Sequence, residues 1–125
     1  MKRIFFTALF TGMLLVFTSH AQDVPRYYVN KQPIDSLRVE YITIHARQRF
    51  LGSKINVELE YGQVNKSLAN SDTRVSDSNG KDIVFNSILD VLNILATLGY
   101  EYVDSFIDPK CDDGKTLKFL LRKIK

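Results

Sequence analysis

The chain has 125 residues, with 17 Lys and Arg against 14 Asp and Glu, two His, one Cys and no Trp, so it has room for one small domain. A single cysteine excludes an internal disulfide, and the fold must therefore be stabilised by its core. The formal net charge of +3 gives no broad basic surface, so we expect no nucleic-acid partner.

Residues 1–21 have the features of a secretory signal peptide. Lys2 and Arg3 precede an apolar run over residues 4–17, and small residues lead to a cleavage site after Ala21. The run is 14 residues long, shorter than the roughly 20 apolar residues that cross a bilayer, so we expect no stable membrane span after cleavage. The sequence therefore predicts an exported protein, periplasmic or secreted, with a mature chain that begins at Gln22.

The mature chain is predicted to consist of an extended lead-in, residues 22–36, and a single α+β domain, residues 37–125. In the lead-in, Asn30-Lys31 separates two short extended pieces, which favours a small hairpin.

Two strands are expected to open the domain. Residues 37–46 are rich in β-branched and aromatic residues, but their apolar positions change parity at Tyr41, which indicates either a bulge there or burial of both faces. Apolar and polar residues alternate cleanly over residues 55–61, so this strand should have one dry and one wet face. The short connection through Gly52 predicts antiparallel pairing of the two strands.

A second turn is predicted at Asp77–Gly80, where Asn79-Gly80 supplies residues that tolerate positive φ angles. The flanking residues 74–76 and 81–84 form either a small hairpin or a turn that leads into a helix.

The clearest element is a helix over residues 87–98. Apolar residues recur at three- and four-residue spacing, Ser87 and Asp90 have the capping-box spacing, and Gly99 stands where a helix commonly ends. The apolar arc is wider than one sheet face requires, so either loops cover its flank or a protein partner or second copy does. The flank that forms this candidate interaction surface consists of Val91, Ile94 and Leu98.

Residues 100–107 and 116–125 have strand character and are separated by an acidic loop, residues 108–114. The order is strand, strand, helix, strand, strand. It predicts an α+β fold in which a small antiparallel sheet of about four to six strands carries one main amphipathic helix on one face.

A family resemblance rests on three segments. The run Phe85–Leu95, the following Leu98-Gly99-Tyr100-Glu101-Tyr102-Val103 and the basic carboxy-terminal strand together resemble a group of short exported bacterial proteins of unknown function. Similar sequences often have Trp where this chain has Tyr100, so an aromatic residue is kept. The resemblance covers most of the mature chain and implies a small α+β module from a bacterium with an outer membrane. It implies no catalytic residues.

Few residues suggest chemistry. His45 is the only histidine outside the leader and has no sequence partner, so we expect a half-exposed histidine at a strand end. Cys111 has acidic neighbours that should raise its thiol pKa, which argues against catalysis. An idle surface thiol and an intermolecular disulfide through Cys111 both stay open.

Acidic and basic clusters offer two weak binding signals. Asp108, Asp112 and Asp113, and separately the Asp77–Gly80 turn, contain only part of a calcium-ligand pattern, so we predict no metal and no cofactor. Basic residues near the carboxy terminus either contact an anion or protect a sheet edge from pairing. These candidate anion contacts are Lys118, Arg122, Lys123 and Lys125.

The sequence favours a non-catalytic binding or assembly module that works outside the cytoplasm. One alternative is a periplasmic inhibitor or immunity-like protein, which would also be small and lack a reactive centre. Another is a small hydrolase or lyase that uses carboxylates near Gly99, with Glu101, Tyr102 and Asp104 as its candidate groups.

Overall fold

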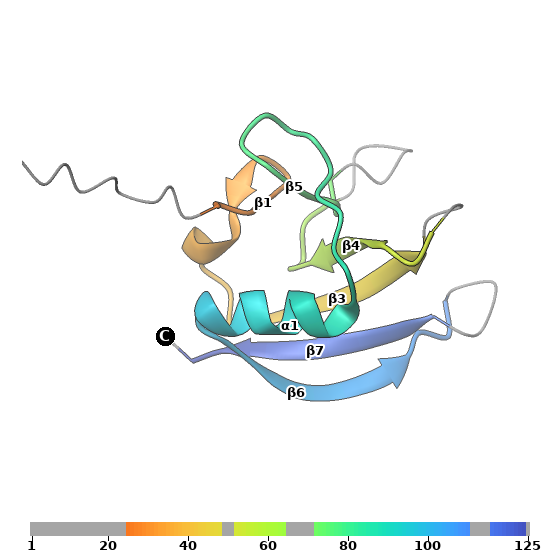
Figure 1. Cartoon of the computed structure of the whole chain (residues 1–125). Helices are drawn as coiled ribbons and strands as arrows, with labels where there is room; N and C mark the ends of the chain where they lie inside the picture. Colours follow the sequence, from red (N-terminus) through yellow and green to blue (C-terminus); the bar gives the residue numbers. More distant parts are fainter. Residues whose placement is uncertain (1–24, 49–51, 65–71, 111–115, 125) are drawn as a thin grey trace, which may run out of the picture.

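A four-stranded antiparallel sheet with strand order β4-β3-β7-β6 forms the centre of the protein (Figure 1). The computed structural model describes residues 25–48, 52–64, 72–110 and 116–124, and the structural statements below concern these residues. The sheet consists of β3 (Tyr41–Gln48), β4 (Ile55–Glu60), β6 (Tyr100–Ile107) and β7 (Leu117–Lys123). The helix α1 (Ile88–Thr97) lies across one face of this sheet, which confirms the predicted α+β fold.

A second, smaller sheet with strand order β2-β1-β5 lies beside the first. It is formed by β1 (Tyr28–Val29), β2 (Gln32–Pro33) and β5 (Val75–Ser76). Asn30 and Lys31 have φ angles of 48° and 62°, so they make the tight turn that the sequence predicts between β1 and β2. The predicted lead-in is not peripheral, because Val29 and Ile34 belong to the buried core.

The strand β3 begins at Tyr41, later than the predicted start at residue 37. Before it come a short 3-10 helix, η1 (Ile34–Ser36), and an extended segment that contains buried Leu37. From Tyr41 onward the pairing register of β3 is continuous. Of the two predicted alternatives, the bulge near Tyr41 is therefore wrong, because the change of parity marks the start of the strand.

The hairpin of β3 and β4 forms as predicted, with Ile44 opposite Leu59 on the face that packs against α1. Backbone hydrogen bonds also cover the outer edge of β4. Ile55 and Phe85 exchange two of them, at 2.9 and 2.8 Å, and the Leu59 N–H donates to the Thr73 carbonyl at 2.7 Å. The turn predicted at Asp77–Gly80 also forms, and the Asp77 N–H donates to the Lys81 carbonyl at 2.9 Å.

The helix α1 is capped at both ends as the sequence predicts. Its N-cap, Ser87, accepts a hydrogen bond from the Asp90 N–H at 3.2 Å, and the Asp90 carboxylate accepts one from the Asn86 N–H at 3.4 Å. The chain leaves the helix through Gly99, whose φ of 90° lies in the left-handed region. Within the described residues, no helix is long and apolar enough to cross a bilayer.

The flank of α1 is covered by the protein's own chain. Val91 is only 3% exposed, and Ile94 and Leu98 are partly buried against the same core. All three border a small apolar gap that Tyr27 and Ile34 line from the amino-terminal segment. The large apolar side chain that α1 does expose is Leu89, at 62%. Of the two alternatives that the sequence leaves open, the structure thus shows cover by the protein's own chain, and a partner at the flank stays a prediction.

The strand β7 follows β6 in the sequence but lies between β3 and β6 in the sheet. Leu121 of β7 pairs with Ile42 and is 1% exposed, so this strand contributes directly to the core. In β6 the register shifts between Tyr102 and Asp104, which places a bulge at Val103.

Candidate functional site

Strand alternation places a row of ionisable residues on the sheet face opposite α1. In this row Glu58 of β4 is paired with His45 of β3, His45 with Lys118 of β7, and Lys118 with Phe106 of β6. The row crosses all four strands, so it joins residues that are far apart in the sequence.

This face is hollowed around the row. The hollow has a volume of about 560 Å³, within the usual range of small-molecule sites. We call it the outer-face hollow. It is lined by Thr43, His45, Arg47, Glu58, Glu60, Phe106, Asp108, Lys110 and Lys118.

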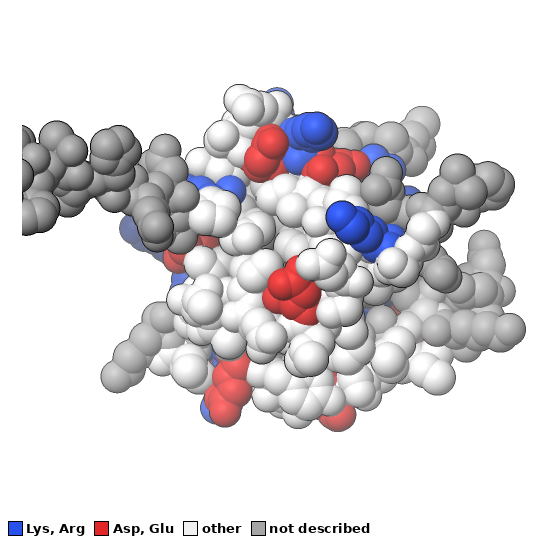
Figure 2. Space-filling view, viewed as in Figure 1, with Lys and Arg blue, Asp and Glu red and all other residues white. Residues whose placement is uncertain are grey.

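The opposite face of the molecule has a different character. Figure 2 views the molecule from the side of α1 and shows a surface in which uncharged residues predominate. The helix itself contributes Asp90 and no basic residue. Strand register places Glu58, Lys118 and Arg122 on the sheet face away from α1.

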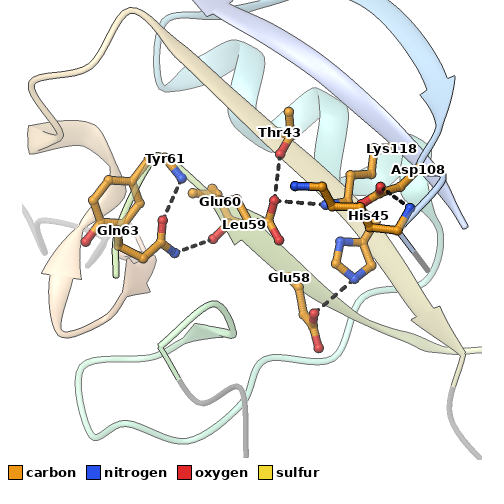
Figure 3. A network of polar contacts seen from close by, with 10 residues as sticks. Thr43, His45, Glu58, Leu59, Glu60, Tyr61, Gln63, Asp108 and Lys118 are labelled. Carbon is orange, nitrogen blue, oxygen red and sulfur yellow. Dashed lines mark hydrogen bonds and ion pairs between the residues drawn. The ribbon is translucent and has the colours of Figure 1, made fainter. Parts of the chain in front are cut away.

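A histidine–glutamate pair lies in the hollow (Figure 3). His45 Nε2 is 2.9 Å from Glu58 Oε2, and the two side chains are 14% and 6% exposed. The hydrogen bond with His45 lowers the pKa of Glu58; burial opposes this effect, and the charges of His45, Arg47 and Arg74 reinforce it. Glu58 is therefore a buried carboxylate held in its charged form.

The second oxygen of Glu58 is held less well. Arg47 Nη1 lies 3.3 Å from Oε1, close enough for charge attraction. The contact lacks hydrogen-bond geometry, so Oε1 is buried without a hydrogen bond from any described residue. Glu58 thus holds His45 by a hydrogen bond and attracts Arg47 by charge alone.

Lys118 forms the second centre of the network. Its Nζ lies 2.9 Å from Glu60 Oε2 and 2.8 Å from Asp108 Oδ2, and the side chain is 10% exposed (Figure 3). Burial acts to lower the pKa of Lys118, but hydrogen bonds to the two carboxylates outweigh it and raise the pKa. The hydrogen bond from Lys118, helped by the Lys110 N–H, lowers the pKa of Asp108. Lys118 is therefore a charged crosslink between β7, β4 and the residue that follows β6.

The end of β4 beside the hollow is fixed by one amide side chain. Gln63 Oε1 accepts the Tyr61 N–H at 2.7 Å, and its Nε2 donates to the Leu59 carbonyl at 2.9 Å (Figure 3). These bonds fold the chain back after Gly62, whose φ is 91°.

The predicted anion contacts do not form one surface. Lys118 is buried in the hollow, whereas Arg122 pairs with Glu101 at 3.5 Å. Lys123 lies on the opposite face of β7, and its Nζ donates to the Leu37 carbonyl at 2.8 Å. Lys125 lies outside the described residues. Strand alternation thus places Lys123 on the other face from Lys118 and Arg122, and anion contact by these residues stays a prediction. The alternative of edge protection is wrong, because β7 lies inside the sheet.

The predicted hydrolase or lyase groups also do not converge. Glu101 lies on the outer face of β6 and Tyr102 on the side of α1, because adjacent residues in a strand point in opposite directions. The Tyr102 hydroxyl donates to Ser105 Oγ at 3.3 Å, and Asp104 is exposed.

The remaining candidates divide between turns and undescribed segments. Asp77 Oδ1 accepts the N–H groups of Asn79 and Lys81, both at 2.9 Å, so this residue stabilises a turn. Among the described residues, no group of His, Cys, Asp and Glu is arranged to hold a metal ion. Cys111, Asp112 and Asp113 lie outside the described residues.

The pairing of His45 with Glu58 is not among the features predicted from the sequence. The sequence pattern predicts that Glu58 lies on a solvent-facing side of its strand and that His45 lies at a half-exposed strand end. Both side chains are instead largely buried. The pairing could have been predicted from the alternation of side chains along the two strands together with the register of the hairpin. Pairing Ile44 with Leu59 necessarily places His45 opposite Glu58.

The chain was compared with known protein families, curated proteins and solved structures. A scan against protein-family models, a search of curated proteins and a search of solved structures each returned no match.

Proposed function

We propose that the chain is an exported, non-catalytic binding module that holds a polar ligand in the outer-face hollow. One observation carries the proposal: a hollow of ligand size on an open sheet face has charged walls that are already fixed in place. Fixed polar groups favour binding because little conformational entropy is lost when the ligand arrives.

The state of the charged groups supports binding rather than catalysis. An amine nucleophile or base needs a lowered pKa, whereas the pKa of Lys118 is raised by its two carboxylates. Glu58 and Asp108 have lowered pKa values, so they are poor proton donors near neutral pH.

The proposal places the protein outside the cytoplasm because of its first 21 residues, with their basic start and apolar run. Mass spectrometry of the protein purified from envelope and medium fractions tests this part. We expect a chain that begins at Gln22. An intact amino terminus on cytosolic material would refute export.

Binding can be tested by amide and side-chain NMR on the isotope-labelled protein with a library of small polar compounds and peptides. We expect at least one compound to shift resonances of Thr43, His45 and Phe106 together, and to be recovered chemically unchanged. Shifts confined to the surface of α1 around Leu89, or no saturable shift with any compound, would refute the proposal.

A hydrolase or lyase is the second candidate, and one observation favours it. His45 is held by a buried carboxylate at 2.9 Å, which is the geometry of a general base and the group that orients it. Chromogenic carboxylic and phosphate esters test this function with the wild type and His45→Ala. Turnover that disappears in His45→Ala would favour it over simple binding.

A further inference from the structure

We infer that the ligand carries an anionic group, a carboxylate or a phosphate, which binds between Arg47 and Lys110 at the mouth of the outer-face hollow. This inference rests on the proposed function and names the chemistry of its ligand. It follows from which charged groups of the hollow are buried with their partners and which stay exposed.

The acids of the hollow are occupied by the protein's own cations. Glu58 and Asp108 have side chains that are only 6% and 14% exposed, and they are held by His45 and Lys118 respectively. A ligand cation would have to displace these partners from buried positions, at considerable cost in free energy.

Two basic side chains remain accessible. Arg47 is 52% exposed and only its Nη1 contacts Glu58, so the rest of its guanidinium is available to donate. Lys110 is exposed and lines the same hollow, where its charge acts on Asp108 without a salt bridge among the described residues. Because buried Glu58 lies against one side of the guanidinium, Arg47 is directed before any ligand binds.

The distribution of charge decides the sign of the ligand. Besides His45, three acids and three bases line the hollow, so the bases are not outnumbered. Among the acids of the hollow, Glu60 is the most exposed. It is paired across the sheet with Thr43, and Thr43 lies four residues before Arg47 on β3. Four residues of a strand span roughly 13 Å, so Glu60 is too far away to neutralise Arg47.

The shape of the basic group fits oxyanions. A guanidinium offers parallel N–H groups that match the two oxygens of a carboxylate or phosphate, and charge-assisted bonds of this kind are strong. Phe106 lies at the β6 end of the row and is 41% exposed, so its ring can contact an apolar part of the same ligand.

Titrations followed by NMR at low ionic strength test the inference with four probes: inorganic phosphate, acetate, glucose and ethylamine. The variant is Arg47→Gln, and its matched control is Arg122→Gln. Arg122 lies on the same sheet face, is similarly exposed at 48%, and pairs with Glu101 outside the hollow. Circular dichroism and urea unfolding establish that both variants keep the fold.

We expect phosphate, acetate or both to shift the side-chain resonances of Arg47 and Lys110, and the responding probe identifies the preferred oxyanion. Arg47→Gln should weaken this binding about ten-fold or more, the usual loss for a charge-assisted hydrogen bond. Lys110→Gln should weaken it in the same direction, whereas Arg122→Gln should stay within about two-fold of wild type.

Three results would overturn the inference. Equal binding by Arg47→Gln, or an equal loss in Arg122→Gln, would show that the site or its specificity is assigned wrongly. Binding of glucose or ethylamine in the hollow, with no response to either anion, would overturn the anionic ligand and leave the proposed function standing. No response to any probe, together with a failed library screen, would overturn both.

Discussion

Replacing Glu58 with Gln should make the stability of the protein less dependent on acid pH. The substitution keeps the shape of the side chain and an acceptor for His45, but removes the buried charge. Because the folded-state pKa of Glu58 is below its ordinary value of 4.5, its ionised form stabilises the fold. This stabilisation is complete above the unfolded-state pKa and is lost as the pH falls through the folded-state pKa.

The size of the effect follows from the contacts. A hydrogen bond to a charged group contributes about 1.5–3 kcal/mol, and Gln keeps a neutral version of it. Gln also removes the cost of burying a charge. We therefore expect Glu58→Gln to lower the free energy of unfolding by about 1–2 kcal/mol at pH 7, and by progressively less below about pH 4.5.

Urea unfolding at several pH values from 7 to 3 measures this difference. For a domain of this size the midpoint should fall by about 1 M at pH 7. Glu101→Gln is the control, because Glu101 is 55% exposed and its pairing with Arg122 at 3.5 Å should contribute little. A difference between wild type and Glu58→Gln that stays constant across the whole pH range would refute the reasoning.

Three further predictions concern the core and the helix, and urea unfolding checks each. Ile44→Ala removes three carbon atoms from a fully buried position. At about 0.8 kcal/mol for each carbon plus a cavity term, it should lower the free energy of unfolding by about 2–5 kcal/mol. A decrease below about 1 kcal/mol would contradict the packing of β3 against α1. Leu89→Ala should change stability by less than about 0.5 kcal/mol, since this side chain is 62% exposed, and a large loss would mean that α1 is turned differently. Ser87→Ala should cost about 1 kcal/mol by removing the N-cap, while Ser78→Ala, in an exposed turn, should cost almost nothing.

The sequence predicts those elements whose signals are local. The helix follows from its periodicity, its capping residues and Gly99, and the turn at Asn30-Lys31 follows from its place between two short extended pieces. The pairing of β1 with β5 joins residues almost fifty positions apart and has no local signal. For the same reason the placement of β7 in the interior of the sheet could not be read from its composition.

The hollow was harder to predict because burial of charged residues depends on long-range partners. Lys118 belongs to a basic segment that suggests an exposed surface, yet Glu60 and Asp108 draw it into the sheet face. What covers the flank of α1 was left open for the same reason. Val91 is covered by residues of the lead-in, whose contribution to the core is not visible in their own pattern.

The position of β7 also constrains how the molecule can be synthesised. Until residues 117–123 are available, the β3–β4 hairpin and the α1–β6 unit have no common strand to join them, so the growing polypeptide has two incomplete halves. Closure then depends on contacts between distant residues, which generally slows folding. Loss of β7 would therefore divide the sheet through its interior, between β3 and β6, rather than trim its edge.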